Sequence, residues 1–168
     1  MIVSATDQYD IANVITGVAG KKGFSAVNIE KALMNSERGF GRKVLEVIEN
    51  EGMNFEHLPS GIDTMSLILN SAEIAHCRDR IVSRICSLVE PDAVSIEDGL
   101  ALIAVVGRGM KAQRGTSGRI FSALAHAHVN VRMIDQGSSE LNIIIGVENS
   151  DYEKAIRAIY SIFVETQL

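Results

Sequence analysis

The chain has 168 residues, of which 46% are hydrophobic and 22% charged, and it carries a formal net charge of −5 at pH 7. This composition is that of an ordinary globular protein with room for one medium domain or two small ones, and it excludes disordered and fibrous proteins. The negative charge argues against an extended nucleic-acid surface, because such surfaces neutralise backbone phosphates with Lys and Arg.

The N-terminal residues and the cysteines restrict the compartment and the chemistry. Met1 to Asp10 is polar and carries acidic residues, so it lacks the basic and apolar regions of a signal peptide. No apolar run approaches the length that spans a membrane, and we therefore expect a cytoplasmic protein with no membrane partner. Cys77 and Cys86 are too few for a disulfide framework or a zinc cluster, and we predict two buried free thiols.

Comparing the chain with itself reveals an internal repeat, in which one sequence unit occurs twice. Such a repeat determines the architecture. A shift of 76 residues (110 − 34 = 76) pairs the two halves without a gap and places Met34 on Met110. Other identical pairs are Arg38 with Arg114, Gly39 with Gly115, Asn54 with Asn130, Gly61 with Gly137 and Ile68 with Ile144. We interpret this repeat as a duplicated domain.

The first copy begins with alternating residues from Ser25 to Leu33 that predict a half-buried strand. After a loop with several glycines, the apolar period becomes helical from Phe40 and should end near Gly52. Strands are predicted at Met53 to Leu58 and at Met65 to Leu69, with a turn at Pro59-Ser60-Gly61 between them. A second helix should bury one stripe before a short fourth strand, Ala93 to Ile96; the stripe is Ile74, Cys77, Ile81, Ile85 and Leu88.

The second copy repeats this layout. A strand from Leu100 to Val106 precedes a helix that runs from about Thr116 to His128. Strands at Val129 to Ile134 and Leu141 to Val147 lead to a helix that buries Tyr152, Ala155, Ile156, Ile159 and Phe163. The order strand-helix-strand-strand-helix-strand predicts an α+β fold of the ferredoxin-like (βαββαβ) type in each copy. Val14 to Ala19 could supply a displaced strand to the second sheet.

The loop from Met34 to Gly41 is the best candidate for a binding site. Its glycines allow backbone N–H groups to approach a ligand, and the start of the following helix favours a carboxylate or a phosphate. The next strand carries Glu56 and ends at Ser60, so a carboxylate would face the amide donors and could hold the other end of a zwitterionic amino acid. The alternative is a tight connection that uses glycine only for its backbone angles.

Other motifs indicate no catalytic or metal chemistry. Gly107 to Ala112 matches the dinucleotide pattern G-x-G-x-x-A, but the long alternating βαβ architecture that this pattern requires is not predicted. His126 and His128 lie two residues apart near a helix end, so they point to different faces and do not form a metal pair. No set of histidine, acid and nucleophile can be assembled from the sequence.

Four segments resemble the C-terminal regulatory region of aspartate kinases (aspartokinases), and the resemblance covers nearly the whole chain from about Ile11. They are Ile15 to Ala19 (ITGVA), Asn35 to Leu45 (NSERGFGRKVL), Glu56 to Asp63 (EHLPSGID) and Val131 to Val147 (VRMIDQGSSELNIIIGV). The resemblance implies two ACT domains in tandem, the first inserted in the second. Residues 20–90 would form the first, effector-binding domain; residues 14–19 with 91–168 would form the second, after an N-terminal segment, 1–13.

The resemblance also implies the function. Such a region mediates feedback inhibition of ATP:L-aspartate 4-phosphotransferase by lysine or threonine, in the pathway to lysine, threonine and methionine. Phosphoryl transfer belongs to an upstream kinase domain, whose phosphate-gripping lysine and glycine motif is absent here. The chain should therefore be inactive alone, with no catalytic residue, metal or cofactor, because ATP and Mg would bind only in that kinase domain. Its expected partners are that domain or subunit, a free amino acid (lysine favoured, threonine possible) and a second copy of itself.

Carried over residue by residue, the effector site has members from the loop and from the second predicted strand. In lysine-inhibited relatives an aspartate commonly matches Glu56, so the carboxylate here reaches one methylene further. The second copy has Arg132 at the equivalent position, a cation where an effector ammonium would sit, and its domain is expected to be structural or to form the dimer interface. The predicted effector site is Met34, Ser36, Gly39, Phe40, Gly41, Phe55, Glu56, Pro59, Ser60 and Asp63.

Two other classes of protein fit the predicted fold. A free-standing ACT-domain sensor could control a different enzyme by direct contact. An RNA-binding ferredoxin-like module would stack bases on aromatic residues of its central strands, whereas the strands here carry Val, Ile and Asn.

Overall fold

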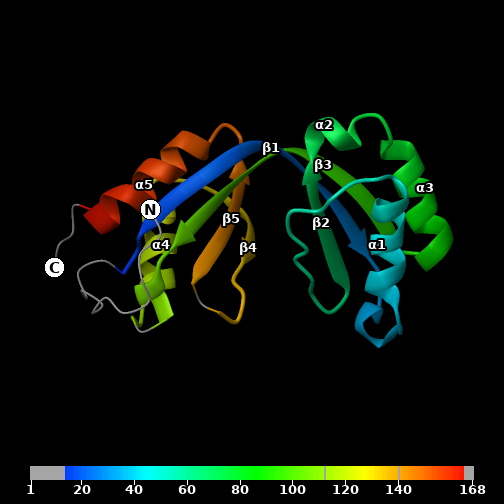
Figure 1. The fold of residues 1–168 in the computed structure, drawn as a ribbon, viewed down its shortest axis with the longest axis horizontal. Helices are drawn as coiled ribbons and strands as arrows, with labels where there is room; N and C mark the ends of the chain where they lie inside the picture. The colour runs from blue at the N-terminus through cyan, green and yellow to red at the C-terminus, as the bar shows by residue number, and fades with distance from the viewer. Residues whose placement is uncertain (1–13, 112, 140, 165–168) are drawn as a thin grey trace. The chain divides into compact units, whose positions relative to one another are not determined.

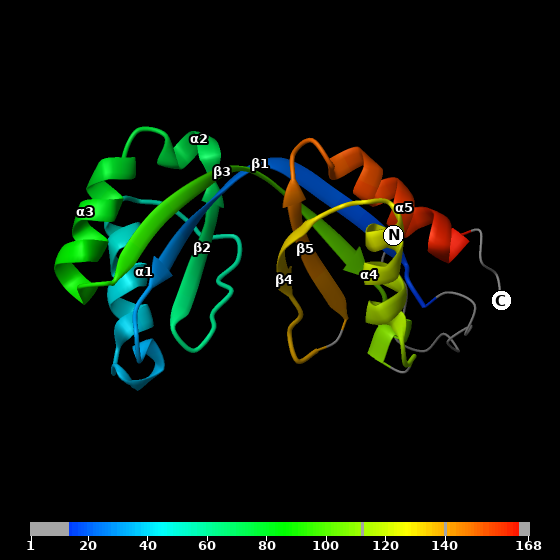
Figure 2. The same cartoon turned by 180° about the vertical axis from the view of Figure 1, so that it is seen from behind.

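The computed structural model describes residues 14–111, 113–139 and 141–164, and the predicted N-terminal segment, 1–13, lies outside them (Figures 1 and 2). The chain forms both strands and helices. In order they are β1 (Gly17–Glu30), a 3-10 helix η1 (Met34–Ser36), α1 (Phe40–Asn50), β2 (Thr64–Asn70), α2 (Ser71–Ile74), α3 (Arg78–Val89), β3 (Ala93–Val106), η2 (Arg108–Lys111), α4 (Thr116–His126), β4 (Val131–Asp135), β5 (Asn142–Glu148) and α5 (Tyr152–Val164).

The chain divides into two compact units. Unit 2 is Lys22–Ala101, and unit 1 joins Met1–Lys21 to Leu102–Leu168. The strand order is β2-β1-β3-β5-β4, and β1 and β3 continue from one unit into the other. This arrangement is the α+β fold that the sequence predicts. The domain ranges expected from the resemblance stay a prediction, because the two units are defined by compactness alone.

Two strands are longer than the sequence predicts. The separate strands expected at Val14 to Ala19 and Ser25 to Leu33 are one strand, β1, and those expected on either side of Gly99 are one strand, β3. Gly23 (φ 92°) and Gly99 (φ 78°) adopt left-handed backbone angles inside these strands without ending them. A strand can absorb a local bulge or bend at glycine, which is why polar, glycine-containing stretches here were wrongly predicted to be connections.

Unit 2 packs two long helices on one face of its strands. β1 pairs antiparallel with β2 from Phe24 opposite Asn70 to Glu30 opposite Thr64. Figures 1 and 2 show α1 and α3 on the same side of these strands. Helix α1 buries its residues at spacings of three and four, as a helix with one apolar face must. The fully or nearly buried side chains of α1 are Phe40, Val44, Val47 and Ile48.

The prediction of a regular strand from Met53 to Leu58 is wrong. The chain there runs beside β2 and joins it only by isolated bridges, His57 to Ile68 and Ser60 to Met65. Pro59 has no N–H to donate, and the Gly61 N–H turns back to the Thr64 carbonyl at 2.7 Å. Its counterpart in unit 1, β4, is a strand as predicted.

The second helix of unit 2 is broken in two. Cys77 has non-helical angles (φ −134°, ψ 13°) between α2 and α3, so the apolar stripe restarts in α3. Val89 is buried, whereas Leu88, which we predicted to be buried, is 42% exposed. Of the two thiols, Cys77 is buried and Cys86 is exposed, so the prediction of two buried cysteines is wrong for Cys86.

The duplication is visible in the backbone. Helices α1 and α4 are 76 residues apart at both ends (116 − 40 = 126 − 50 = 76), and left-handed residues repeat at Gly39 and Gly115. In the later elements the offset becomes 78: β2 and β5 end at 70 and 148, and buried Ile81 of α3 corresponds to buried Ile159 of α5. The repeat therefore contains a gap of two residues before β5, contrary to the sequence prediction.

Among the described residues, no helix is both long and apolar enough to cross a membrane. The described side chains also contain no group of three or more His, Cys, Asp and Glu arranged to hold a metal ion.

Candidate functional site

The candidate loop, Met34–Gly41, is anchored by two apolar residues, and most of its polar residues are exposed. Met34 and Phe40 are 5% and 3% exposed and belong to the core of unit 2, whereas Ser36 is exposed. Gly39 precedes α1 with φ 77°, an angle that disfavours any side chain. A Cβ on Gly41 would meet Met65 Cε at 3.5 Å, an ordinary contact, so the protein itself does not require glycine at this position.

Backbone hydrogen bonds hold the candidate loop against the turn before β2. The Leu33 N–H donates to Asp63 Oδ1 at 2.8 Å, and the Lys31 N–H donates to the Asp63 carbonyl at 2.9 Å. The Asn35 N–H donates to the Ile62 carbonyl at 3.2 Å. Leu33 itself is left-handed (φ 59°) and 71% exposed. Asp63 therefore supports the shape of the loop in addition to lying at its rim.

The edge segment, Phe55–Asp63, runs along β2, and its residues lie at different distances from the loop. Ser60 bridges to Met65, which Gly41 approaches, whereas the Glu56 N–H donates to the Ile68 carbonyl at 2.8 Å. Ile68 lies three positions beyond Met65 in β2, so Glu56 lies about 10 Å further along β2 than Ser60. Met34, Gly41, Ser60 and Asp63 are thus gathered around the start of β2, whereas Glu56 is placed further along it.

Phe55 borders an open hollow on the surface of unit 2. Its side chain is 46% exposed. The hollow has a volume of about 400 Å³, and it is lined by Leu45, Ile48, Glu49, Gly52, Met53, Asn54 and Phe55. The lining combines the second half of α1, the connection at 52–54 and the first residue of the edge segment. The sequence did not predict this hollow, because its walls come from residues whose apolar period only indicated a helix face.

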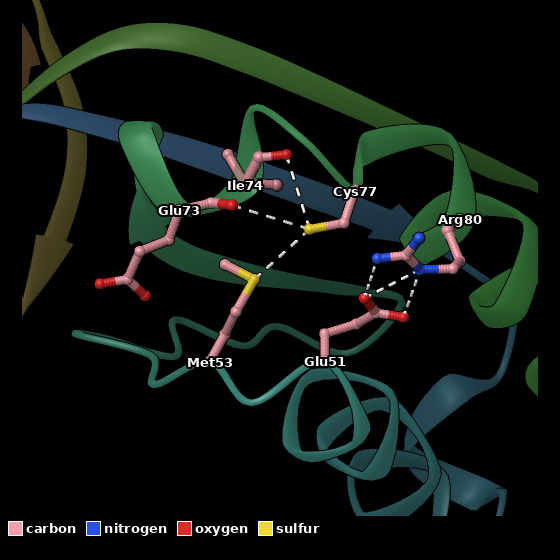
Figure 3. A network of polar contacts seen from close by, with 6 residues as sticks. All are labelled: Glu51, Met53, Glu73, Ile74, Cys77 and Arg80. Carbon is pink, nitrogen blue, oxygen red and sulfur yellow. Dashed lines mark hydrogen bonds and ion pairs between the residues drawn. The ribbon is translucent and has the colours of Figure 1, made fainter.

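A polar and sulfur network fixes the chain just before Phe55 (Figure 3). The Arg80 guanidinium donates to both carboxylate oxygens of Glu51 at 2.6 to 2.9 Å, and Cys77 Sγ lies 3.6 Å from Met53 Sδ. The Arg80 guanidinium lowers the pKa of the Glu51 carboxyl, and burial raises the pKa of the Cys77 thiol. These contacts connect the end of α1 to α3 and so position the edge segment.

A cluster of charges that the sequence analysis missed surrounds the candidate loop. The Glu37 carboxylate pairs with Lys31 at 2.5 Å and with Lys43 at 2.8 Å, and these two ammonium groups lower its pKa. The sequence signal that could have indicated this cluster was Glu37, a charged residue in a loop of mostly small and polar residues. Its partners lie just after β1 and in α1, and sequence spacing alone does not show that they meet.

The equivalent loop of unit 1 is packed against backbone. A Cβ on Gly107 would lie 2.0 Å from the Val14 carbonyl oxygen, so the space beside this glycine is filled by protein. In β4, Arg132 Nη1 lies 3.3 Å from Glu148 Oε1 at the surface. Neither feature resembles the arrangement in unit 2.

Comparisons with known proteins agree on one family. The ACT domain profile matches residues 103–163. Aspartokinase 3 of Bacillus subtilis (strain 168) is 42% identical over 150 residues, which are 89% of this chain and 33% of that protein. The crystal structure of Clostridium acetobutylicum aspartate kinase superimposes with a TM-score of 0.90 at 46% identity, over 95% of this chain and 37% of that one.

The chain belongs to the ACT-domain regulatory regions of aspartate kinases. The resemblance stated from the sequence is confirmed. The chain spans about a third of the length of the curated aspartokinase and of the Clostridium kinase that it matches. The regulatory subunit of aspartate kinase from Thermus flavus has the same fold, with a TM-score of 0.78 at 18% identity, over 90% of this chain and 99% of that one.

Proposed function

We propose that this aspartate kinase regulatory region binds a free amino acid and thereby lowers the activity of an aspartate kinase catalytic domain or subunit. The observation that carries the proposal is identity above 40% to aspartokinases over about nine-tenths of the chain. The reaction, phosphorylation of aspartate by ATP, would take place outside this chain. The role of the chain would be feedback inhibition in the synthesis of aspartate-family amino acids.

Lysine is the proposed effector, and it would bind in unit 2. Aspartokinase III of Escherichia coli, which shares the fold at 21% identity, has been crystallised in complex with lysine and aspartate. Here the α-carboxylate would lie at the start of α1 near Phe40, because the N-terminal end of a helix favours an anion. Asp63 lies with Gly41 near the start of β2 and would pair with the α-ammonium, because a carboxylate has about four lone-pair sites and can accept more than one hydrogen bond. Glu56 lies further along β2 and would receive the ε-ammonium at the far end of the lysine side chain.

Isothermal titration with lysine and with threonine tests this site. Replacing Glu56 by Gln keeps the shape but removes the charge, and it should weaken lysine binding by about 1.5 to 3 kcal/mol, as for a hydrogen bond to a charged group. The matched control is Glu46→Gln, which removes a carboxylate that pairs with Arg42 on α1. Unchanged lysine affinity in the Glu56 variant would contradict the assignment, and tighter binding of threonine than of lysine would replace the proposed effector.

A homodimer is proposed to form through unit 2. The edge segment joins β2 only by isolated bridges, so a second copy could cover this edge, and edges left open in a sheet tend to pair. Sedimentation equilibrium with lysine should give twice the chain mass. A mass of 18.2 kDa at high concentration would rule the dimer out.

The second candidate function is a free-standing ACT sensor that controls another enzyme. Affinity purification from the native cell distinguishes the two. A co-purifying aspartate kinase, inhibited by lysine only when this chain is present, supports the first proposal. Recovery with an unrelated enzyme would support the second.

A further inference from the structure

Lys31 directly follows β1 and contacts three different parts of unit 2. Its ammonium group donates to the Val89 carbonyl at the end of α3 and pairs with Glu37 Oε2 of the candidate loop at 2.5 Å. The same nitrogen lies 5.9 Å from the centre of the Phe40 ring, within the range of a cation–π contact. One side chain thus joins the loop, the first residue of α1 and the end of α3.

Glu37 is held from two sides. Lys31 contacts one carboxylate oxygen, and Lys43 of α1 contacts the other at 2.8 Å. The three side chains are only 23%, 26% and 33% exposed for Lys31, Glu37 and Lys43, so they are partly shielded from water. Ion pairs that are shielded and share a carboxylate constrain a loop better than an isolated surface pair does.

The duplication provides an internal comparison. At an offset of 76 residues, Lys31 corresponds to Gly107, and Glu37 corresponds to Gln113. Lys43 corresponds to Arg119, which donates instead to the Ile162 carbonyl at 3.1 Å and stacks on Phe163 at 5.0 Å. Gly107 can accept no side chain, because Val14 fills the space beside it. Among the described residues of unit 1, the positions equivalent to Lys31 and Glu37 carry no charge, so the charged cluster of unit 2 is not repeated there.

We propose that Lys31 is a positioning residue that holds the candidate loop, through Glu37, in the conformation that receives the effector. This inference rests on the proposed function for its ligand, but its structural part concerns the loop alone. A loop held in its bound shape loses less conformational freedom on binding, so the affinity for the effector is higher.

The test compares Lys31→Met with Lys31→Arg and with Lys154→Met. Lys154 is a matched control in unit 1, because it too pairs with a carboxylate (Asp151, 2.8 Å) and donates to a backbone carbonyl (His128, 3.2 Å). In Lys31→Met, hydrogen exchange of the loop amides without any ligand should accelerate about tenfold, and lysine should bind about fivefold more weakly. Lys31→Arg should recover most of both effects, and Lys154→Met should change neither by more than about twofold.

A double-mutant cycle with Glu37→Gln adds an independent check. If Lys31 acts through Glu37, the double variant should exchange and bind no worse than Lys31→Met alone. Additive effects would overturn the proposal, as would wild-type loop exchange in Lys31→Met with only a lowered melting temperature. If the wild-type chain binds neither lysine nor threonine, the proposed function fails, and loop exchange in the variants still decides whether Lys31 positions the loop.

Discussion

At the scale of single residues, Asp63 stabilises the left-handed turn that precedes the candidate loop. Its carboxylate accepts the Leu33 N–H at 2.8 Å, and its carbonyl accepts the Lys31 N–H. Asp63→Ala should lower the free energy of unfolding by about 1 kcal/mol, because the Leu33 amide loses its acceptor. Asp63→Asn retains an acceptor oxygen and should stay within about 0.5 kcal/mol of wild type. Urea unfolding of both variants measures the difference, and equal losses would contradict this role.

The two thiols differ in reactivity for a reason that belongs to individual residues. Cys77 is buried and its pKa is raised by desolvation, whereas Cys86 is exposed. Because the thiolate is the reactive species, a thiol reagent should modify Cys86 quickly in the native protein and Cys77 only after unfolding. Cys86→Ser should abolish the fast phase and Cys77→Ser should keep it. A fast phase that survives in Cys86→Ser would show that Cys77 is accessible.

At the scale of elements, the apolar residues of α3 differ in burial and therefore in how much they stabilise unit 2. Ile81 is fully buried in the core, and Leu88, seven positions later, is 42% exposed. Ile81→Ala should reduce the free energy of unfolding by about 2 to 5 kcal/mol, through lost burial and a residual cavity. Leu88→Ala should change it by less than about 1 kcal/mol, since little burial is lost. The urea unfolding midpoints of the two variants, measured with an unchanged denaturant dependence, test this difference. Similar losses in both variants would support the prediction from the sequence that Leu88 belongs to the buried stripe of the helix.

At the scale of the whole molecule, stability should fall in acid. The pKa values of Glu37 and Glu51 are lowered from the usual 4.5 by their Lys and Arg partners. The unfolded chain then takes up protons first, so the stabilisation is present above about pH 4.5 and is lost as the pH falls towards the lowered values. The urea midpoint of wild type should drop over this range, and Glu51→Gln and Arg80→Gln should both flatten the drop. If the urea midpoint falls with pH as steeply in both variants as in wild type, the Glu51–Arg80 pair contributes nothing to this loss of stability in acid.

The sequence by itself determined the duplication, the α+β class and the family. Apolar periods place α1 and α4 correctly, because burial of one helix face is encoded within a dozen adjacent residues. The position of the candidate loop could also be predicted, since glycines and a helix start lie together in the chain. The burial of Met34 and Phe40 was not predicted, because the sequence analysis placed both residues in the effector site. Gly39 adopts a left-handed backbone angle (φ 77°), which is the role that the alternative interpretation of this loop gives to its glycines.

Only the tertiary structure decided what depends on distant partners. It joined predicted strands through Gly23 and Gly99, and it broke the second helix of unit 2 at Cys77. It also placed Val89 in the core and left Leu88, which was predicted to be buried, exposed. It also showed that Lys31, Glu37 and Lys43 meet, although they lie just after a strand, in a loop and in a helix. Periodicity reports which face of an element is apolar, but the pairing of charges and the continuation of a strand are set by neighbours that are remote in the chain.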